Sequence, residues 1–143
     1  MMADDEKKIN SLPLINQALD NTLASSIGLE ITQLSDSRVC GKIPVDYRTK
    51  QPFGLLHGGA SVVLAETLGS MGGNMYVDSN AEMVVGIEIN ANHLKSVSSG
   101  WVHGVAKPIK IGRKIQVWKI EISNDDNELI CVSRLTLAIV SKK

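Results

Sequence analysis

A single helix-like segment interrupts a chain otherwise dominated by β-strand patterns, and this order restricts the possible folds most. Residues 57–75 carry apolar side chains at helical spacing. Two short strand-like segments, 29–34 and 39–45, come before it, after an amphipathic helix expected within 12–28. Four longer alternating segments follow it, at 83–94, 101–111, 114–123 and 129–140. The order predicts an α+β domain in which an antiparallel sheet curls around the long central helix.

The length and charge balance narrow the class of protein further. A chain of 143 residues is expected to form a charged tail over residues 1–10 and a single domain over 11–143. Only 3% of the residues are aromatic, so the core must consist mainly of Leu, Ile and Val. The 15 basic residues balance the 15 acidic ones. Without a broad positive field, neither nucleic acid nor an anionic membrane surface is an expected partner.

Nothing in the sequence indicates a targeting segment or a metal site. The charged start is followed by no long apolar stretch, so we expect no signal peptide, no transmembrane helix and a cytoplasmic location. Cys40 and Cys131 lack the short spacing of a zinc site or a redox pair and are interpreted as packed thiols. His103 has no acidic or Cys neighbour at ligand spacing and is interpreted as structural or exposed.

The central helix has two distinct faces when it is projected at about 100° per residue. One face is apolar and is expected to pack in the core: Ala60, Leu64, Leu68, Met71 and Met75. The other consists of small residues around one carboxylate: Gly59, Val62, Glu66, Ser70 and Gly73. Small residues let a ligand or a second helix approach closely, and Ser70 lies one turn from Glu66. Glu66 is therefore a candidate functional carboxylate, although it could also be a surface residue or pair with a Lys.

The start of this helix is a candidate oxyanion site. The sequence HGGAS, from His57 to Ser61, offers no good side-chain cap, so helix amides beginning near Gly58 are expected to be available to a ligand. Gln51 and His57 are the other polar groups of the loop, and the Gln51 amide could donate to a polarised carbonyl oxygen. The alternatives are a simple tight turn at the glycines and side chains that only bond to the loop backbone.

Together these residues form a coherent site for attack on a carbonyl group, with donors at one end and a carboxylate at the other. Gly58 and Glu66 are eight residues apart, which is about 12 Å along a helix at about 1.5 Å per residue. One carbonyl can hardly contact both groups in one chain. We therefore expect at least a dimer, in which Glu66 of one chain faces Gln51, His57 and Gly58 of the other.

The segments PVDYRTKQPFGLLHGGASVVLAETLGS and VVGIEINANHLKS resemble those of the hotdog-fold thioesterases. The resemblance extends from about Ile27 to Val140. It is strongest to the branch acting on aromatic acyl-CoA, which includes the 1,4-dihydroxy-2-naphthoyl-CoA hydrolases of menaquinone synthesis and their enterobactin-associated relatives. The catalytic pattern of that branch falls without a gap on four residues of this chain: Gln51, Gly58, Glu66 and Ser70.

The resemblance implies how these residues act. The Gly58 N–H would polarise the thioester carbonyl with Gln51 nearby, and His57 would help to position the thioester. Glu66 would attack directly or activate water, and Ser70 would orient the carboxylate or that water. The resemblance also implies a tetramer built as a dimer of dimers. Coenzyme A would enter as part of the substrate, so no separate cofactor is expected, and thioesters of carrier proteins are plausible donors.

A neutral chain needs a local basic cluster to bind the phosphates of coenzyme A. The segment AKPIKIGRK offers Lys107, Lys110, Arg113 and Lys114 around a turn, and His93 ends another strand. We interpret His93, Lys110 and Arg113 as candidate substrate-binding residues, although the basic turn could simply be a soluble hairpin. Gly86 interrupts an apolar strand and is a candidate for making room for the acyl group. A bulge or a helix-crossing point would explain this glycine equally well.

Two other functions fit part of the pattern. A hotdog dehydratase or isomerase would need an acid/base His, for which His57 is the candidate in the helix-entry loop. A non-catalytic acyl-CoA sensor would need no semi-buried carboxylate. The leading prediction is hydrolysis of an acyl-CoA thioester.

Overall fold

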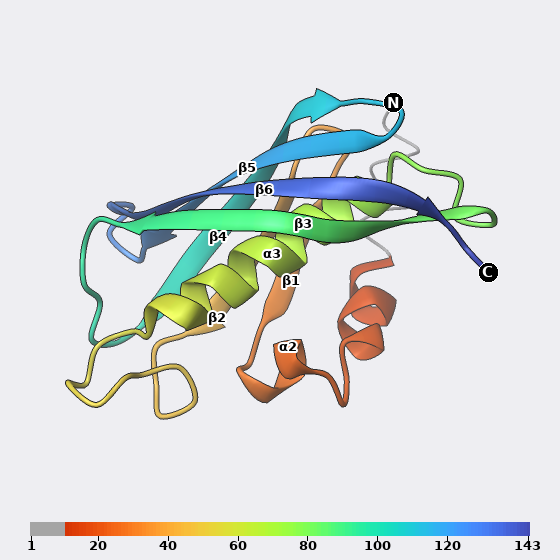
Figure 1. The fold of residues 1–143 in the computed structure, drawn as a ribbon. Helices are drawn as coiled ribbons and strands as arrows, with labels where there is room; N and C mark the ends of the chain where they lie inside the picture. Colours follow the sequence, from red (N-terminus) through yellow and green to blue (C-terminus); the bar gives the residue numbers. More distant parts are fainter. Residues whose placement is uncertain (1–10) are drawn as a thin grey trace.

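The computed structural model describes residues 11–143 and confirms the predicted order of elements. A six-stranded antiparallel sheet, with strand order β1-β2-β4-β5-β6-β3, packs around one long helix, α3 (Gly58–Asn74). Figure 1 shows the sheet curving over α3, with β3 running alongside the helix in the opposite direction. The expected tail, 1–10, lies outside the described residues.

The six strands begin and end within one residue of their predicted limits. They are β1 (Glu30–Leu34), β2 (Val39–Pro44), β3 (Glu82–His93), β4 (Trp101–Ile111), β5 (Ile115–Asn124) and β6 (Leu129–Ser141). All neighbouring strands pair antiparallel. The alternation of apolar residues therefore identified the strands.

The predicted helix within 12–28 is wrong in one respect, because the structure divides it. Residues 11–18 are helical, and a second short helix, α2 (Leu23–Ser26), follows. Between them Asn21 has a φ of 61°, a left-handed conformation that Asn tolerates better than most residues. Thr22 then begins α2 with a capping box. The apolar spacing continued across this break and concealed it.

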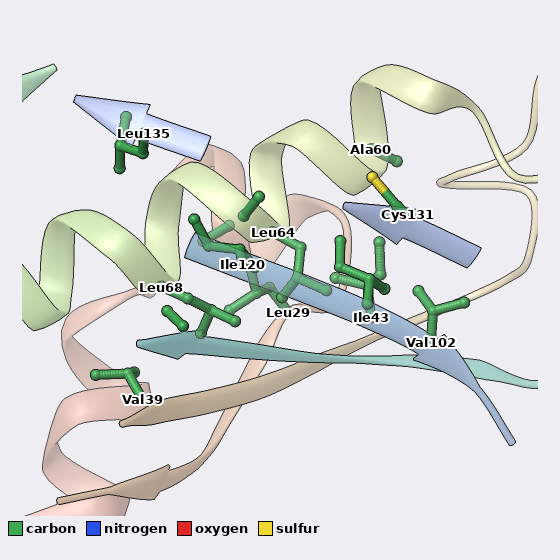
Figure 2. Close-up of a cluster of buried hydrophobic side chains, with 14 of the residues drawn as sticks. Leu29, Val39, Ile43, Ala60, Leu64, Leu68, Val102, Ile120, Cys131 and Leu135 are labelled. Atoms are coloured by element: carbon green, nitrogen blue, oxygen red, sulfur yellow. The ribbon is translucent and has the colours of Figure 1, made fainter. Parts of the chain in front are cut away.

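The core lies between α3 and the concave face of the sheet. In Figure 2 the α3 side chains Leu64 and Leu68 lie among strand side chains that include Ile43 and Ile120, and all four are 0% exposed. The buried arc of α3 is wider than the predicted apolar stripe because the sheet covers the helix from several sides. Gly73, expected on the open face, is buried, and a Cβ there would be 2.6 Å from Leu137 Cδ1. Met71 and Met75, expected in the core, are only half-buried.

The polar side chain of Gln116 is completely buried in this core. Its Nε2 donates to Gly73 O at 3.2 Å, and its Oε1 accepts from Trp118 Nε1 at 2.9 Å. We expect Gln116→Leu to lower the free energy of unfolding by about 1–3 kcal/mol, because it leaves the buried Trp118 Nε1–H without an acceptor and removes one of the two donors to Gly73 O. Urea unfolding measures this loss. The control is the same change at the exposed Gln17; equal losses in the two variants would contradict the interpretation.

The two edge strands of the sheet, β1 and β3, differ in what covers them. At the β1 edge the Asn16 side chain satisfies Ile31, because Oδ1 accepts the Ile31 N–H at 2.7 Å and Nδ2 donates to its carbonyl at 3.0 Å. At the other edge, β3 pairs only with β6 among the described strands. Its exposed residues include Met83, Val85 and Ile87, which are 41%, 39% and 57% exposed. A long apolar edge strand of this kind is suited to pairing with another chain.

Candidate active site

The loop before α3 ends in a helix cap that the sequence prediction missed. His57 is the N-cap residue, and its Nδ1 accepts the Gly59 N–H at 2.7 Å. The His57 carbonyl accepts from the amides of Ala60 and Ser61. The expectation of an uncapped start is therefore wrong, because the imidazole ring acts as the acceptor. One amide is still left over, since the Gly58 N–H donates to no acceptor among residues 11–143.

A cleft of about 360 Å³ opens at this helix start and brings three predicted residues together, namely Gln51, Gly58 and His93. The His93 ring packs against Gly58, where a Cβ would be only 2.7 Å from His93 Nε2. Gln51 Oε1 accepts the Phe53 N–H at 2.5 Å. This bond matches the alternative in which Gln51 fastens the loop, but it also holds the amide so that Nε2 remains available as a donor.

Three further polar residues line this cleft, Ser61, Lys95 and Ser96, and Ser61 was not selected from the sequence. Ser61, only 1% exposed, lies one helical turn after Gly58, and that spacing was the available signal. Lys95 lies near the end of β3, but its Nζ is 2.5 Å from Glu128 Oε1. This hydrogen bond and the one from Asn124 lower the pKa of the Glu128 carboxyl. The charge of Lys95 is thus already paired.

Glu66 lies two turns further along α3 and is half-buried. Its carboxylate points at β3, where a Cβ built on Gly86 would be 2.8 Å from Glu66 Oε1. No described residue donates a hydrogen bond to this carboxylate. That includes Ser70, whose hydroxyl was expected to reach it.

The antiparallel course of α3 and β3 arranges these contacts at two separate places. Gly58 and His93 meet at one end, and Glu66 and Gly86 meet further along. Eight residues of helix, about 12 Å, separate the two places. One chain therefore holds two separate groups, which we call the donor half, at the Gly58 N–H, and the carboxylate half, at Glu66.

The predicted basic residues lie apart from both halves. Lys110 is near the end of β4 and Arg113 is in the turn between β4 and β5, three strands away from β3 in the sheet. Lys107 pairs with Lys119, and the register shifts after Pro108, so that Lys110 lies opposite Val117. Within the described chain, the structure does not bring Lys110 or Arg113 into the cleft of His93.

His103 forms a surface contact, whereas Cys131 is buried and Cys40 is half-buried. His103 Nε2 lies 2.8 Å from Asp125 Oδ1, and this hydrogen bond, with one from the Trp101 N–H, lowers the pKa of the Asp125 carboxyl. Burial raises the pKa of the Cys40 and Cys131 thiols. Within residues 11–143 no group of three or more His, Cys, Asp or Glu side chains could hold a metal ion. No helix in the same range has the length and apolar character needed to cross a membrane.

Comparison with known proteins identifies the family. Residues 53–131 match the family model described as the thioesterase superfamily. The chain is 45% identical to the 1,4-dihydroxy-2-naphthoyl-CoA hydrolase of Escherichia coli, over 94% of this chain and 98% of that protein. It is also 45% identical to the proofreading thioesterase EntH of Cronobacter turicensis, over 94% of this chain and 97% of that protein.

Solved structures agree with this result. A thioesterase of Haemophilus influenzae superposes with a TM-score of 0.88 at 48% identity, over 91% of this chain and 90% of that one. A thioesterase of Staphylococcus aureus, solved as a Gln→Ala variant, gives a TM-score of 0.80 at 40% identity, over 82% and 97% of the two chains. The chain therefore belongs to the thioesterase superfamily. It has the hotdog fold and is a thioester hydrolase.

Proposed function

We propose that this enzyme hydrolyses an aromatic acyl-CoA thioester to the free acid and coenzyme A, at a site shared by two chains. The observation that carries the proposal is the division of the site along the α3 and β3 pair. Gly58 presents an unused N–H at one place, and Glu66 presents a carboxylate without a hydrogen-bond donor at the other. Each half supplies what the other lacks for attack on a carbonyl.

The exposed edge of β3 offers a way to join the two halves. If two β3 strands pair antiparallel about Ile89 and Asn90, Gly86 of one chain lies opposite His93 of the other. The carboxylate half of each chain then faces the donor half of its neighbour. Two such dimers would form the tetramer that the sequence resemblance implies. The apolar residues at this edge support the same pairing.

The chemistry follows from the shared site. The Gly58 N–H and Gln51 Nε2 donate to the thioester oxygen and stabilise the negative charge that develops there. Glu66 of the other chain either attacks the carbonyl carbon or takes a proton from an attacking water. In the first case the C–S bond breaks, coenzyme A leaves as the thiolate, and water then hydrolyses the acyl-glutamyl anhydride. In the second, the hydroxide attacks and the same C–S bond breaks.

The other predicted residues have supporting parts in this proposal. His57 fixes the helix start through its ring, and Ser70 lies one turn from Glu66, where it can orient the attacking water. His93 borders the donor half, and Lys110 and Arg113 are proposed to contact the phosphates of coenzyme A. Coenzyme A takes part only as a portion of the substrate.

The Staphylococcus aureus relative supports the choice of Gln51 and Glu66. Its structures were solved as a Gln→Ala and as a Glu→Ala variant, and the two changed positions are 15 residues apart. Gln51 and Glu66 have the same separation. This agreement makes the two residues the strongest candidates for the polar groups of the reaction.

The acyl group is proposed to be aromatic, by analogy with the two named relatives. We propose a role in menaquinone synthesis, and hydrolysis of carrier-protein thioesters is the second candidate.

We expect kcat/KM for benzoyl-CoA and naphthoyl-CoA to exceed that for fatty acyl-CoA of equal carbon number by at least about 10-fold, because pocket shape discriminates acyl groups. Capture of the released thiol measures all three rates. The same aromatic acyl group on a carrier protein serves as the comparison for the leaving group. A clear preference for fatty acyl-CoA would contradict the proposal while leaving thioester hydrolysis intact.

A further inference from the structure

Gly86 is a glycine in the middle of a strand, at a place where its backbone conformation does not require one. Among residues 11–143, positive-φ glycines occur only at Gly28, Gly54 and Gly100. Glycine weakens a strand interior because it adds conformational freedom and no packing. Some other requirement must therefore favour glycine at this position. The structure offers one, since the space that a Cβ would fill is occupied by the Glu66 carboxylate, 2.8 Å away.

The strand is also irregular at this point. Gly86 pairs with Leu137 and Glu88 with Thr136, so Ile87 is an extra residue that forms a β-bulge. In a regular strand, residues seven apart, such as Gly86 and His93, would face opposite sides. The bulge reverses the alternation between them. As a result, one strand turns Gly86 toward Glu66 and His93 toward Gly58 on the same helix.

We infer that Gly86 and the adjoining bulge at Ile87 form a niche that positions the Glu66 carboxylate for the reaction. Gly86 is thus a positioning residue. The space left by its missing side chain accommodates the Glu66 carboxylate and not the acyl group of the substrate. This inference rests on the proposed function of Glu66. It differs from the expectation that Gly86 accommodates the acyl group, and the two make different kinetic predictions.

The niche matters for activity more than for stability. A methyl group at Gly86 would collide with the end of a flexible side chain, which can rotate away at little cost to the fold. The carboxylate would have to retreat by about 0.6 Å to regain an ordinary 3.4 Å contact. No hydrogen bond from a described residue would hold it near its former place. A catalytic group displaced by about 1 Å can lose about 10²-fold in rate.

The test compares two Gly→Ala variants whose added methyl groups meet neighbours at nearly the same distance. For Gly86→Ala we expect kcat to fall by about 10²-fold, with KM changed less than about threefold and the melting temperature unchanged or higher. Gly104→Ala is the control, because its Cβ would lie 2.7 Å from Leu68 Cδ1 in the core. There we expect the opposite result, a lower melting temperature and an unchanged kcat per folded site.

A rescue experiment separates positioning from other roles. Glu66→Asp shortens the side chain by one methylene and withdraws the carboxylate from the niche. We expect the double variant Gly86→Ala/Glu66→Asp to lose much less activity than the product of the two single losses, because the shorter carboxylate no longer meets the methyl group. Multiplicative losses would overturn the inference.

Substrate size and Glu66→Gln distinguish the remaining outcomes. A positioning role predicts the same kcat loss in Gly86→Ala for acetyl-CoA and naphthoyl-CoA. A loss that appears as raised KM with naphthoyl-CoA alone would overturn the niche and favour an acyl-binding role for Gly86. If Gly86→Ala keeps its full kcat while Glu66→Gln is inactive, the inference about the niche is overturned and the proposed function is retained. An active Glu66→Gln would reject the proposed function itself.

Discussion

Glu66→Gln is expected to reduce kcat for aryl-CoA hydrolysis by about 10²–10⁴-fold, the range that general-base catalysis contributes. The amide has nearly the shape of the carboxylate but can neither attack the carbonyl carbon nor accept a proton from water. Glu66 is half-buried, and no described residue donates a hydrogen bond to its carboxylate, so its replacement removes no polar contact that stabilises the fold. Binding of the CoA ester should therefore be largely retained.

The matched control is Glu88→Gln, the same chemical change on the adjoining strand. The Glu88 carboxylate is exposed and accepts from Asn90 Nδ2 at 3.1 Å, and it takes no part in the proposed reaction. Thiol capture measures turnover in both variants, and titration calorimetry with the acyl-CoA measures binding to Glu66→Gln. Turnover at the original rate in Glu66→Gln, or an equal loss in the Glu88 control, would exclude the catalytic role.

The fold could be predicted closely because its information is local and periodic. Most strands alternate apolar and polar residues, and their apolar residues face α3, so that periodicity alone located the strands within one residue. The exception is β3, whose Met83, Val85 and Ile87 are exposed. The first helical region was harder, since a single residue, Asn21, interrupts a continuous apolar spacing. Gly73 is buried because the sheet covers more of α3 than its apolar face. A helical projection does not show how much of the helix the sheet covers.

The candidate site was predicted in its residues but less well in its contacts. The motif residues are close in sequence, so Gln51, Gly58 and Glu66 could be selected directly. The cap at His57 could not, because it depends on the rotation of an imidazole ring. Nor could the contact between Glu66 and Gly86, which are 20 residues apart and on different elements.

The β3 bulge shows why contacts along a strand are hard to predict. A bulge changes which side chains face inward after it, and no residue type in VVGIEINANH marks its position unambiguously. Reading the strand as regular would place Gly86 and His93 on opposite faces. A second shift lies between Pro108 and Lys110 in β4, and the sequence likewise did not predict its position.

A shared site also implies that two variants, each inactive alone, can form an active site together in a mixed oligomer. The first is Glu66→Gln. The second is Gly58→Pro, which removes the Gly58 N–H at the first helical position, where proline is well tolerated. His57, with φ −67° and ψ 129°, already has the extended conformation required before proline. Loss of one oxyanion donor should reduce kcat by about 10²–10³-fold. Gly58→Ala is the control, since it also crowds His93 but keeps the N–H.

Random assembly of equal amounts of Glu66→Gln and Gly58→Pro chains is expected to restore about a quarter of the original activity. Half of the sites receive an intact Glu66, and half of those receive an intact Gly58 from the other chain. Co-expression with two affinity tags, or refolding from a mixture, prepares the sample, and thiol capture gives the rate per chain. If each chain held a complete site, the mixture would show only the average of two impaired variants. Activity at that level in verified mixed oligomers would rule out the division between chains, because each mixed pair contains one intact donor half and one intact carboxylate half.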